Sequence, residues 1–156
     1  MSDIDFIELD SIKPIHKMKQ QGHFCHGLTK YWFTHLSDQE NLFENLDMSI
    51  IKKYQNDNIF YVLKLYRCLL FTKHFKETSE LIKYIVVKFN KKRSKKLTVI
   101  LISQFSYNLS KWHEIGLYKN QFFDANIGWF EFEDLYTCLA WFFISRNLKY
   151  RNLIIL

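Results

Sequence analysis

The sequence has 156 residues, of which 48% are hydrophobic and 18% aromatic, and this predicts one folded domain over residues 1–156 and excludes a disordered chain. Its net charge is +6, from 22 basic and 16 acidic residues, which favours acidic partners over basic ones. The longest apolar run, residues 138–144, is far shorter than the roughly 20 residues of a membrane-spanning helix, so we expect no transmembrane segment.

The first part of the chain is predicted to be mainly helical. A short segment ends near Pro14, and its acidic start lacks the pattern of a secretory signal peptide. Apolar residues at helical spacing then predict helices over 24–36, 38–45, 47–56, 59–70 and 81–89. Ser37 and Asp47 are the expected N-caps of the second and third helices, and residues 72–77 connect the last two.

The pattern changes to strands after residue 96. β-Branched and aromatic residues predict strands over 97–102, 112–118, 121–124 and 129–132, which suggests a meandering antiparallel sheet. A helix over 134–147 and a last strand over 150–156 follow. The predicted fold class is therefore α+β, with an N-terminal helical half packed on a C-terminal antiparallel sheet.

A basic run connects the helical half to the first of these strands. Its cationic residues are Lys91, Lys92, Arg93, Lys95 and Lys96. The run could dock on an acidic membrane or protein surface, but a solvated connection between helix and strand is the interpretation that we favour. No zinc-finger spacing, RNA-binding signature or aromatic-interleaved basic stripe accompanies it, so we expect no nucleic-acid partner.

The three cysteines differ in their surroundings. Their odd number and wide spacing argue against a disulfide scaffold and for a reducing compartment. Cys68 and Cys138 lie inside apolar helical patterns and are expected in the core. Cys25 lies where a glycine-containing turn becomes the predicted helix over 24–36. The positive end of the helix dipole favours a thiolate there, which makes Cys25 a candidate nucleophile.

Two residues further along the chain could complete a site with Cys25. His113 lies on the predicted strand over 112–118, and Asp124 ends the strand over 121–124. The order Cys, His, Asp is that of papain-like enzymes. Taken singly, each has a simpler interpretation: a buried structural thiol, a core or surface histidine, and a turn-forming aspartate. Only the combination favours a catalytic site.

Histidines near Cys25 raise the alternative of a metal site. His16, His23, His26 and His35 surround it in the sequence. A second Cys/His pair at the spacing of a structural zinc site is missing, so we expect no metal and no cofactor.

Three segments resemble the YopT/AvrPphB type of papain-like cysteine protease, a family of secreted bacterial virulence effectors. Residues 25–33 are similar to its Cys-x-Gly-Leu segment and the bulky pair after it. Residues 122–130 are similar to its Phe-Phe-Asp-Pro-Asn-x-Gly-x-Phe segment, with Ala125 in place of the proline. His113 precedes this second segment on a strand, as the family histidine does, at a shorter separation from Asp124.

The resemblance implies a role for each residue. Cys25 would attack a carbonyl carbon, His113 would transfer protons, and Asp124 would orient the imidazole ring. The side chain of Gln20, or of Gln21 in the neighbouring register, would join the Cys25 amide in stabilising the oxyanion.

The implied function is a cysteine protease that cleaves a protein in a host or target cell. A dedicated bacterial secretion system would deliver it to the host cytosol. Two alternatives stay open. The same residues could serve an acyltransferase or deamidase, or the chain could be a non-catalytic interaction module that docks through its basic run. Reactivity of the Cys25 thiol separates an enzyme from such a module.

Overall fold

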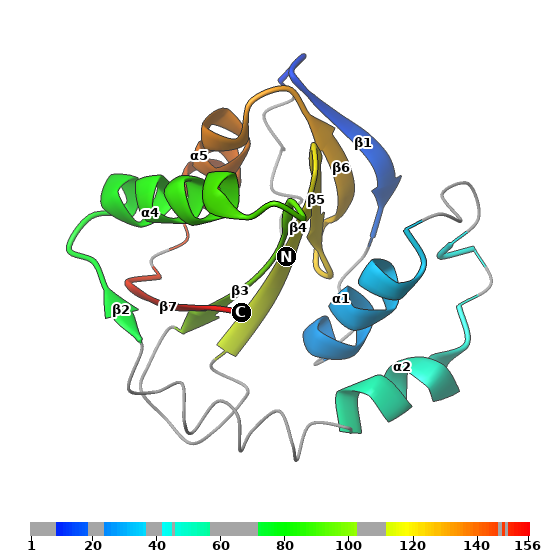
Figure 1. The fold of residues 1–156 in the computed structure, drawn as a ribbon. Helices are drawn as coiled ribbons and strands as arrows, with labels where there is room; N and C mark the ends of the chain where they lie inside the picture. The colour runs from blue at the N-terminus through cyan, green and yellow to red at the C-terminus, as the bar shows by residue number, and fades with distance from the viewer. Residues whose placement is uncertain are drawn as a thin grey trace.

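The structure is a computed structural model that describes residues 9–18, 24–36, 42–44, 46–56, 72–102, 112–146, 148 and 150–156. Among these residues, the strands form one sheet in the order β1-β6-β5-β4-β3-β7-β2, and all neighbouring strands are antiparallel (Figure 1). The strands are β1 (Ile12–Lys17), β2 (Lys73–His74), β3 (Lys96–Ile102), β4 (Trp112–Tyr118), β5 (Gln121–Asp124), β6 (Gly128–Phe132) and β7 (Asn152–Ile155).

Helices cover both faces of this sheet. They are α1 (Cys25–Thr34), α2 (Met48–Asn56), α4 (Thr78–Lys91) and α5 (Leu135–Ser145). In Figure 1, α4 and α5 lie on one side of the sheet, and α1 and α2 on the other. Within the described ranges, no helix combines the length and the apolar character needed to cross a membrane.

The sheet divides the core into two parts, because successive side chains along a strand point to opposite faces of the sheet. On β5, Phe122 packs against Phe142 of α5 with ring centroids 4.9 Å apart. Its neighbour Phe123 stacks on Trp32 of α1, with ring centroids 5.3 Å apart, on the other face of the sheet. All four rings are fully buried. The aromatic content seen in the sequence therefore fixes α1 and α5 on opposite faces of the same strands.

Most predicted elements are confirmed. Helices are present in the predicted segments that became α1, α2, α4 and α5, and strands in those that became β3 to β7. Asp47 is confirmed as a capping residue, because its carboxylate accepts a hydrogen bond from the Ser49 amide at 2.9 Å. The predicted helix over 59–70 and the predicted cap Ser37 lie outside the described residues.

The structure departs from the sequence analysis in three places: two strands that were not predicted and one predicted helix that is wrong at residues 42–44. The segment around Pro14 forms strand β1, which pairs with β6 at the edge of the sheet, where a residue without an N–H is tolerated. The connection over 72–77 contains the short strand β2, paired with β7. Residues 42–44 form a turn and not a helix, since Phe43 there stacks on Phe123. In each case a partner distant in sequence decides the local conformation.

The basic run forms a tight connection between α4 and β3. Lys92 donates to the Leu156 carbonyl at 3.1 Å, and Lys95 to the Asn90 carbonyl at 2.7 Å. The Lys96 ammonium lies over the Phe33 ring, 4.7 Å from its centroid. Lys91 and Arg93 are exposed. Three of the five cations thus contact groups of the chain itself.

Helix α1 approaches β4 closely at Gly116. A methyl group added at Gly116 would lie 2.8 Å from the ring of Trp32, which is closer than van der Waals contact allows. Gly116 is therefore the position at which β4 leaves room for α1, the helix that begins at Cys25.

We expect Gly116→Ala to destabilise the protein by about 1–3 kcal/mol, because the added methyl group overpacks the interface between α1 and β4. Urea unfolding followed by tryptophan fluorescence measures this change. Ser94→Ala, at an exposed turn, is the control and should leave the free energy of unfolding unchanged. Equal stability of the two variants would contradict this account of Gly116.

Candidate active site

Cys25 is the first residue of α1 and carries a free, partly exposed thiol. Its backbone carbonyl accepts a hydrogen bond from the Thr29 hydroxyl at 2.7 Å, which orders the first turn. That turn contains no acidic residue, so nothing within it offsets the positive end of the helix dipole. The thiol therefore lies where a negative charge is favoured.

His113 and Asp124 meet at one end of the sheet. Asp124 pairs with Ile115 in the register of β4 and β5, and His113 is two residues from Ile115, so both side chains are on the same face. The His113 Nε2 and Asp124 Oδ2 atoms are 2.5 Å apart. The Asp124 side chain is fully buried and that of His113 is 11% exposed. The pair is thus a short contact shielded from water.

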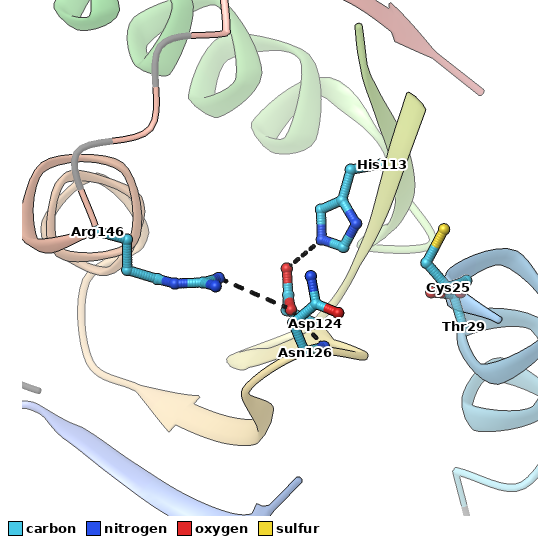
Figure 2. A network of polar contacts seen from close by, with 6 residues as sticks. All are labelled: Cys25, Thr29, His113, Asp124, Asn126 and Arg146. Atoms are coloured by element: carbon cyan, nitrogen blue, oxygen red, sulfur yellow. Dashed lines mark hydrogen bonds and ion pairs between the residues drawn. The ribbon is translucent and has the colours of Figure 1, made fainter. Parts of the chain in front are cut away.

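Figure 2 shows Cys25, on α1, on the side of His113 away from Asp124. Because Asp124 contacts Nε2, the Nδ1 atom is the ring nitrogen left for the thiol. The structure therefore brings together the three residues that the sequence singled out. The Cys25 thiol is near enough to affect the protonation of His113 by hydrogen bonding and by charge.

The environment favours a charged His113–Asp124 pair. Burial lowers the pKa of His113, but the charge and hydrogen bond of Asp124, helped by Cys25, outweigh it and raise the pKa to about 10. Burial likewise opposes ionisation of Asp124, yet His113, Arg146 and the Asn126 amide together hold the pKa of that carboxyl below its ordinary value. At neutral pH the pair is therefore an imidazolium and a carboxylate.

Two further contacts hold the Asp124 carboxylate. Its Oδ1 atom accepts a hydrogen bond from the backbone N–H of Asn126 at 2.7 Å, within the turn between β5 and β6. The guanidinium of Arg146, at the C-terminal end of α5, lies 4.0 Å from the same oxygen (Figure 2). After the turn, Gly128 has φ of +126°, and a methyl group there would lie 2.1 Å from the His16 carbonyl oxygen of β1. Only glycine fits that position.

Sequence reasoning missed Arg146 and Tyr150. Arg146 follows a helix that is almost entirely apolar, and this isolated cation was the one available signal. Tyr150 is close to the same network: burial raises the pKa of its hydroxyl, as do the charges of Asp124 and Cys25, while Arg146 lowers it. No pattern in the sequence indicates that role, because Tyr150 is brought close to the site by core packing and by its place just before β7, which pairs with β3.

Other predicted residues are placed as follows. Gln20 and Gln21 lie outside the described residues, as do His23 and Cys68. Cys138 is fully buried, as expected for a core residue, and burial raises the pKa of its thiol, with a smaller contribution from Asp134. Across the described ranges, no three His, Cys, Asp or Glu side chains are arranged to hold a metal ion.

The described elements form an α+β fold, and one end of its sheet carries the contact between His113 and Asp124, with Cys25 beside it. The structure is similar to the crystal structure of the Pseudomonas avirulence protein AvrPphB, with a TM-score of 0.55 and 18% sequence identity. The match covers 83% of this chain and 88% of that chain. No protein-family model and no curated protein sequence matches this chain. The predicted α+β, papain-like fold is confirmed.

The charged pair gives the stability a defined pH dependence. The pKa of His113 rises from an ordinary 6.5 to about 10 on folding, so its contribution is complete below pH 6.5 and is lost as the pH rises toward 10. The pKa of Asp124 is lowered from 3.8, so its contribution is complete above that value and is lost as the pH falls further.

We therefore expect the free energy of unfolding of the wild type, measured in urea, to fall between pH 6.5 and pH 10 more steeply than that of His113→Gln. The variant lacks the group that gains a proton on folding, so its free energy of unfolding should change less with pH over this range. Parallel curves for the two proteins would mean that folding does not raise the pKa of His113.

Proposed function

We propose that this chain is a papain-like cysteine protease in which Cys25, His113 and Asp124 form the catalytic triad. The observation that carries the proposal is the position of His113 between a buried carboxylate on Nε2 and the thiol at the start of α1. An imidazolium beside a cysteine stabilises the thiolate, which is the nucleophilic form. The similar fold and the resemblance to YopT/AvrPphB-type proteases support the same conclusion.

Acylation begins when the Cys25 thiolate attacks the carbonyl carbon of the scissile peptide bond. The carbonyl oxygen takes the negative charge, and the tetrahedral intermediate collapses as the C–N bond breaks. The His113 imidazolium donates its proton to the leaving amine and becomes neutral. Asp124 holds the ring in place through Nε2, so that the proton moves at Nδ1.

Deacylation regenerates the enzyme. Neutral His113 takes a proton from water, and the resulting hydroxide attacks the thioester carbon. The C–S bond then breaks, which releases the carboxylic acid and restores the thiolate and the imidazolium. An amine in place of water would give acyl transfer, and a glutamine side chain as substrate would give deamidation, so the identity of the product decides among these reactions.

Backbone groups at the start of α1 suit oxyanion stabilisation. The first amides of a helix have no partner within the helix, and the Cys25 amide belongs to this set. We propose that it acts together with the side chain of Gln20, or of Gln21. Each such donor typically contributes about 2.7–4 kcal/mol to transition-state stabilisation.

The resemblance to secreted virulence effectors also leads us to propose where the enzyme acts. Delivery by a bacterial secretion system would place it in the host cytosol, where a host protein would be its substrate. A reducing cytosol suits an enzyme that depends on a free thiol.

Thiol reactivity tests the proposed site. We expect iodoacetamide to label Cys25 of the native protein at pH 6 much faster than Cys138, since Cys25 is partly exposed beside the His113 imidazolium whereas Cys138 is buried in the core. Mass spectrometry of briefly alkylated protein measures both rates, and unfolded protein provides the reference. His113→Ala should lower the rate at Cys25 and leave that at the buried Cys138 unchanged. A Cys25 rate that is the same in the wild type and in folded His113→Ala would argue for a non-catalytic module.

Activity in cells tests the reaction. Cys25→Ala and His113→Ala should each abolish the new protein N-termini that the wild type generates on expression in a host cell, while Asp124→Asn should retain residual cleavage. Quantitative N-terminal proteomics measures the cleavage, and circular dichroism checks that each variant folds. Wild-type cleavage by a folded His113→Ala variant would exclude the triad. Deamidated or acylated proteins without new N-termini would indicate one of the alternative reactions.

We further propose that the basic run recruits the enzyme to an acidic surface. Lys91, Arg93 and Lys96 are its exposed members, and Lys96, like Lys92 and Lys95, also contacts the chain itself. Attraction between exposed charges is screened by salt, so recruitment of this kind must weaken as the ionic strength rises.

A double variant, Lys91→Gln with Arg93→Gln, should therefore bind anionic vesicles less than the wild type at low salt, and the difference should shrink at physiological salt. Co-sedimentation with phosphatidylserine vesicles measures the binding. Lys13→Gln with Lys52→Gln removes the same charge elsewhere and is the matched control. Identical sedimentation of all three proteins would leave the run as a solvated connection.

A further inference from the structure

A second histidine–carboxylate contact lies directly beside the proposed triad. His26, the residue after Cys25, contacts Glu114, the residue after His113, with 2.7 Å between Nδ1 and Oε2. The side chains are 13% and 7% exposed. The contact therefore joins α1 to β4 one residue away from both the proposed nucleophile and the proposed base.

Successive side chains of β4 point to opposite faces of the sheet, which explains how the adjacent residues His113 and Glu114 make different contacts. His113 points to the face that holds Asp124, so Glu114 points to the opposite face, against which α1 packs. The α1 helix reaches β4 at two places, through His26 on Glu114 in its first turn and through Trp32 on Gly116 further along. The first of these contacts is the nearer to Cys25 along the helix.

The first turn of α1 is also held from its outer side. The Gly27 amide donates to the side-chain oxygen of Gln55 on α2 at 2.8 Å. A methyl group added at Gly27 would lie 2.5 Å from the Ile51 carbonyl oxygen, so α2 presses closely on this turn. Three consecutive residues thus carry the nucleophile, the contact to β4 and the contact to α2.

We propose that His26 and Glu114 are positioning residues that set the separation of Cys25 and His113 by fixing the first turn of α1 on β4. The inference rests on the proposed function, because it assumes that the Cys25–His113 contact is catalytic. Neither residue needs to touch the substrate. A displacement of about 1 Å between reacting groups can cost on the order of 100-fold in rate, so a short, largely buried contact at this point has a large effect.

The readout is the ratio of the iodoacetamide rates of Cys25 at pH 6 and pH 9.5. At the higher pH most thiols are ionised without assistance, so this rate reports the accessibility of Cys25, whereas the rate at pH 6 depends on a neighbouring imidazolium. We expect His26→Ala and Glu114→Ala each to lower the ratio by about 10- to 100-fold. Combining them should lower it no further, because either change alone breaks the same contact.

Matched controls separate this effect from general damage. His35→Ala removes a histidine from the opposite end of α1, and Glu131→Gln removes an exposed carboxylate on β6. Both controls should keep the wild-type ratio. The double variant His26→Ala with Glu114→Gln leaves no unpaired buried charge, so it provides a folded test if a single variant does not fold.

The outcomes distinguish the two proposals. A low ratio in the wild type, or one unchanged in His113→Ala, would overturn the proposed triad itself. A high wild-type ratio that falls in His113→Ala but persists in folded variants of His26 and Glu114 would overturn only the positioning role. A fall in both sets of variants, with the controls unchanged, supports the proposal.

Discussion

The arrangement of this protein depends on one buried charge, the carboxylate of Asp124. A fully buried carboxylate is stable only when other groups compensate its lost hydration, and His113, the Asn126 amide and Arg146 provide that compensation. These groups come from β4, the turn before β6 and the end of α5. The need to satisfy one carboxylate therefore ties the central strands to the helix behind them and keeps His113 protonated at the end of the sheet.

The thiol reaches this network from the opposite face. Helix α1 packs on β4 through Trp32, which uses the space left by Gly116, and through the contact of His26 with Glu114. The sheet separates the two groups: the alternation of side chains along β4 directs His113 and Glu114 to different faces, and the thiol comes beside His113 at the end of this strand. A site built in this way depends on packing on both sides of one strand, so changes distant from the chemistry can alter the separation of thiol and imidazole.

Much of the fold could be predicted because its elements carry strong local patterns. The apolar spacing along α4 and the β-branched run of β3 need no partner to be recognised. Strand β1 could not be predicted, since it contains Pro14 and is largely exposed, and its conformation comes from pairing with β6, more than a hundred residues away. The turn at 42–44 likewise follows from the stacking of Phe43 on Phe123.

The sequence by itself determined the chemistry available: a thiol at the start of a helix, a histidine on one strand and a carboxylate at the end of the next, in an order that resembles a known protease family. Residue types and local periodicity suffice for that, because helix and strand patterns are short-range. Only the tertiary structure decided which groups surround these residues. Arg146 on Asp124 and Glu114 on His26 are contacts across 22 and 88 residues, and such contacts depend on how whole elements pack, which no local pattern records.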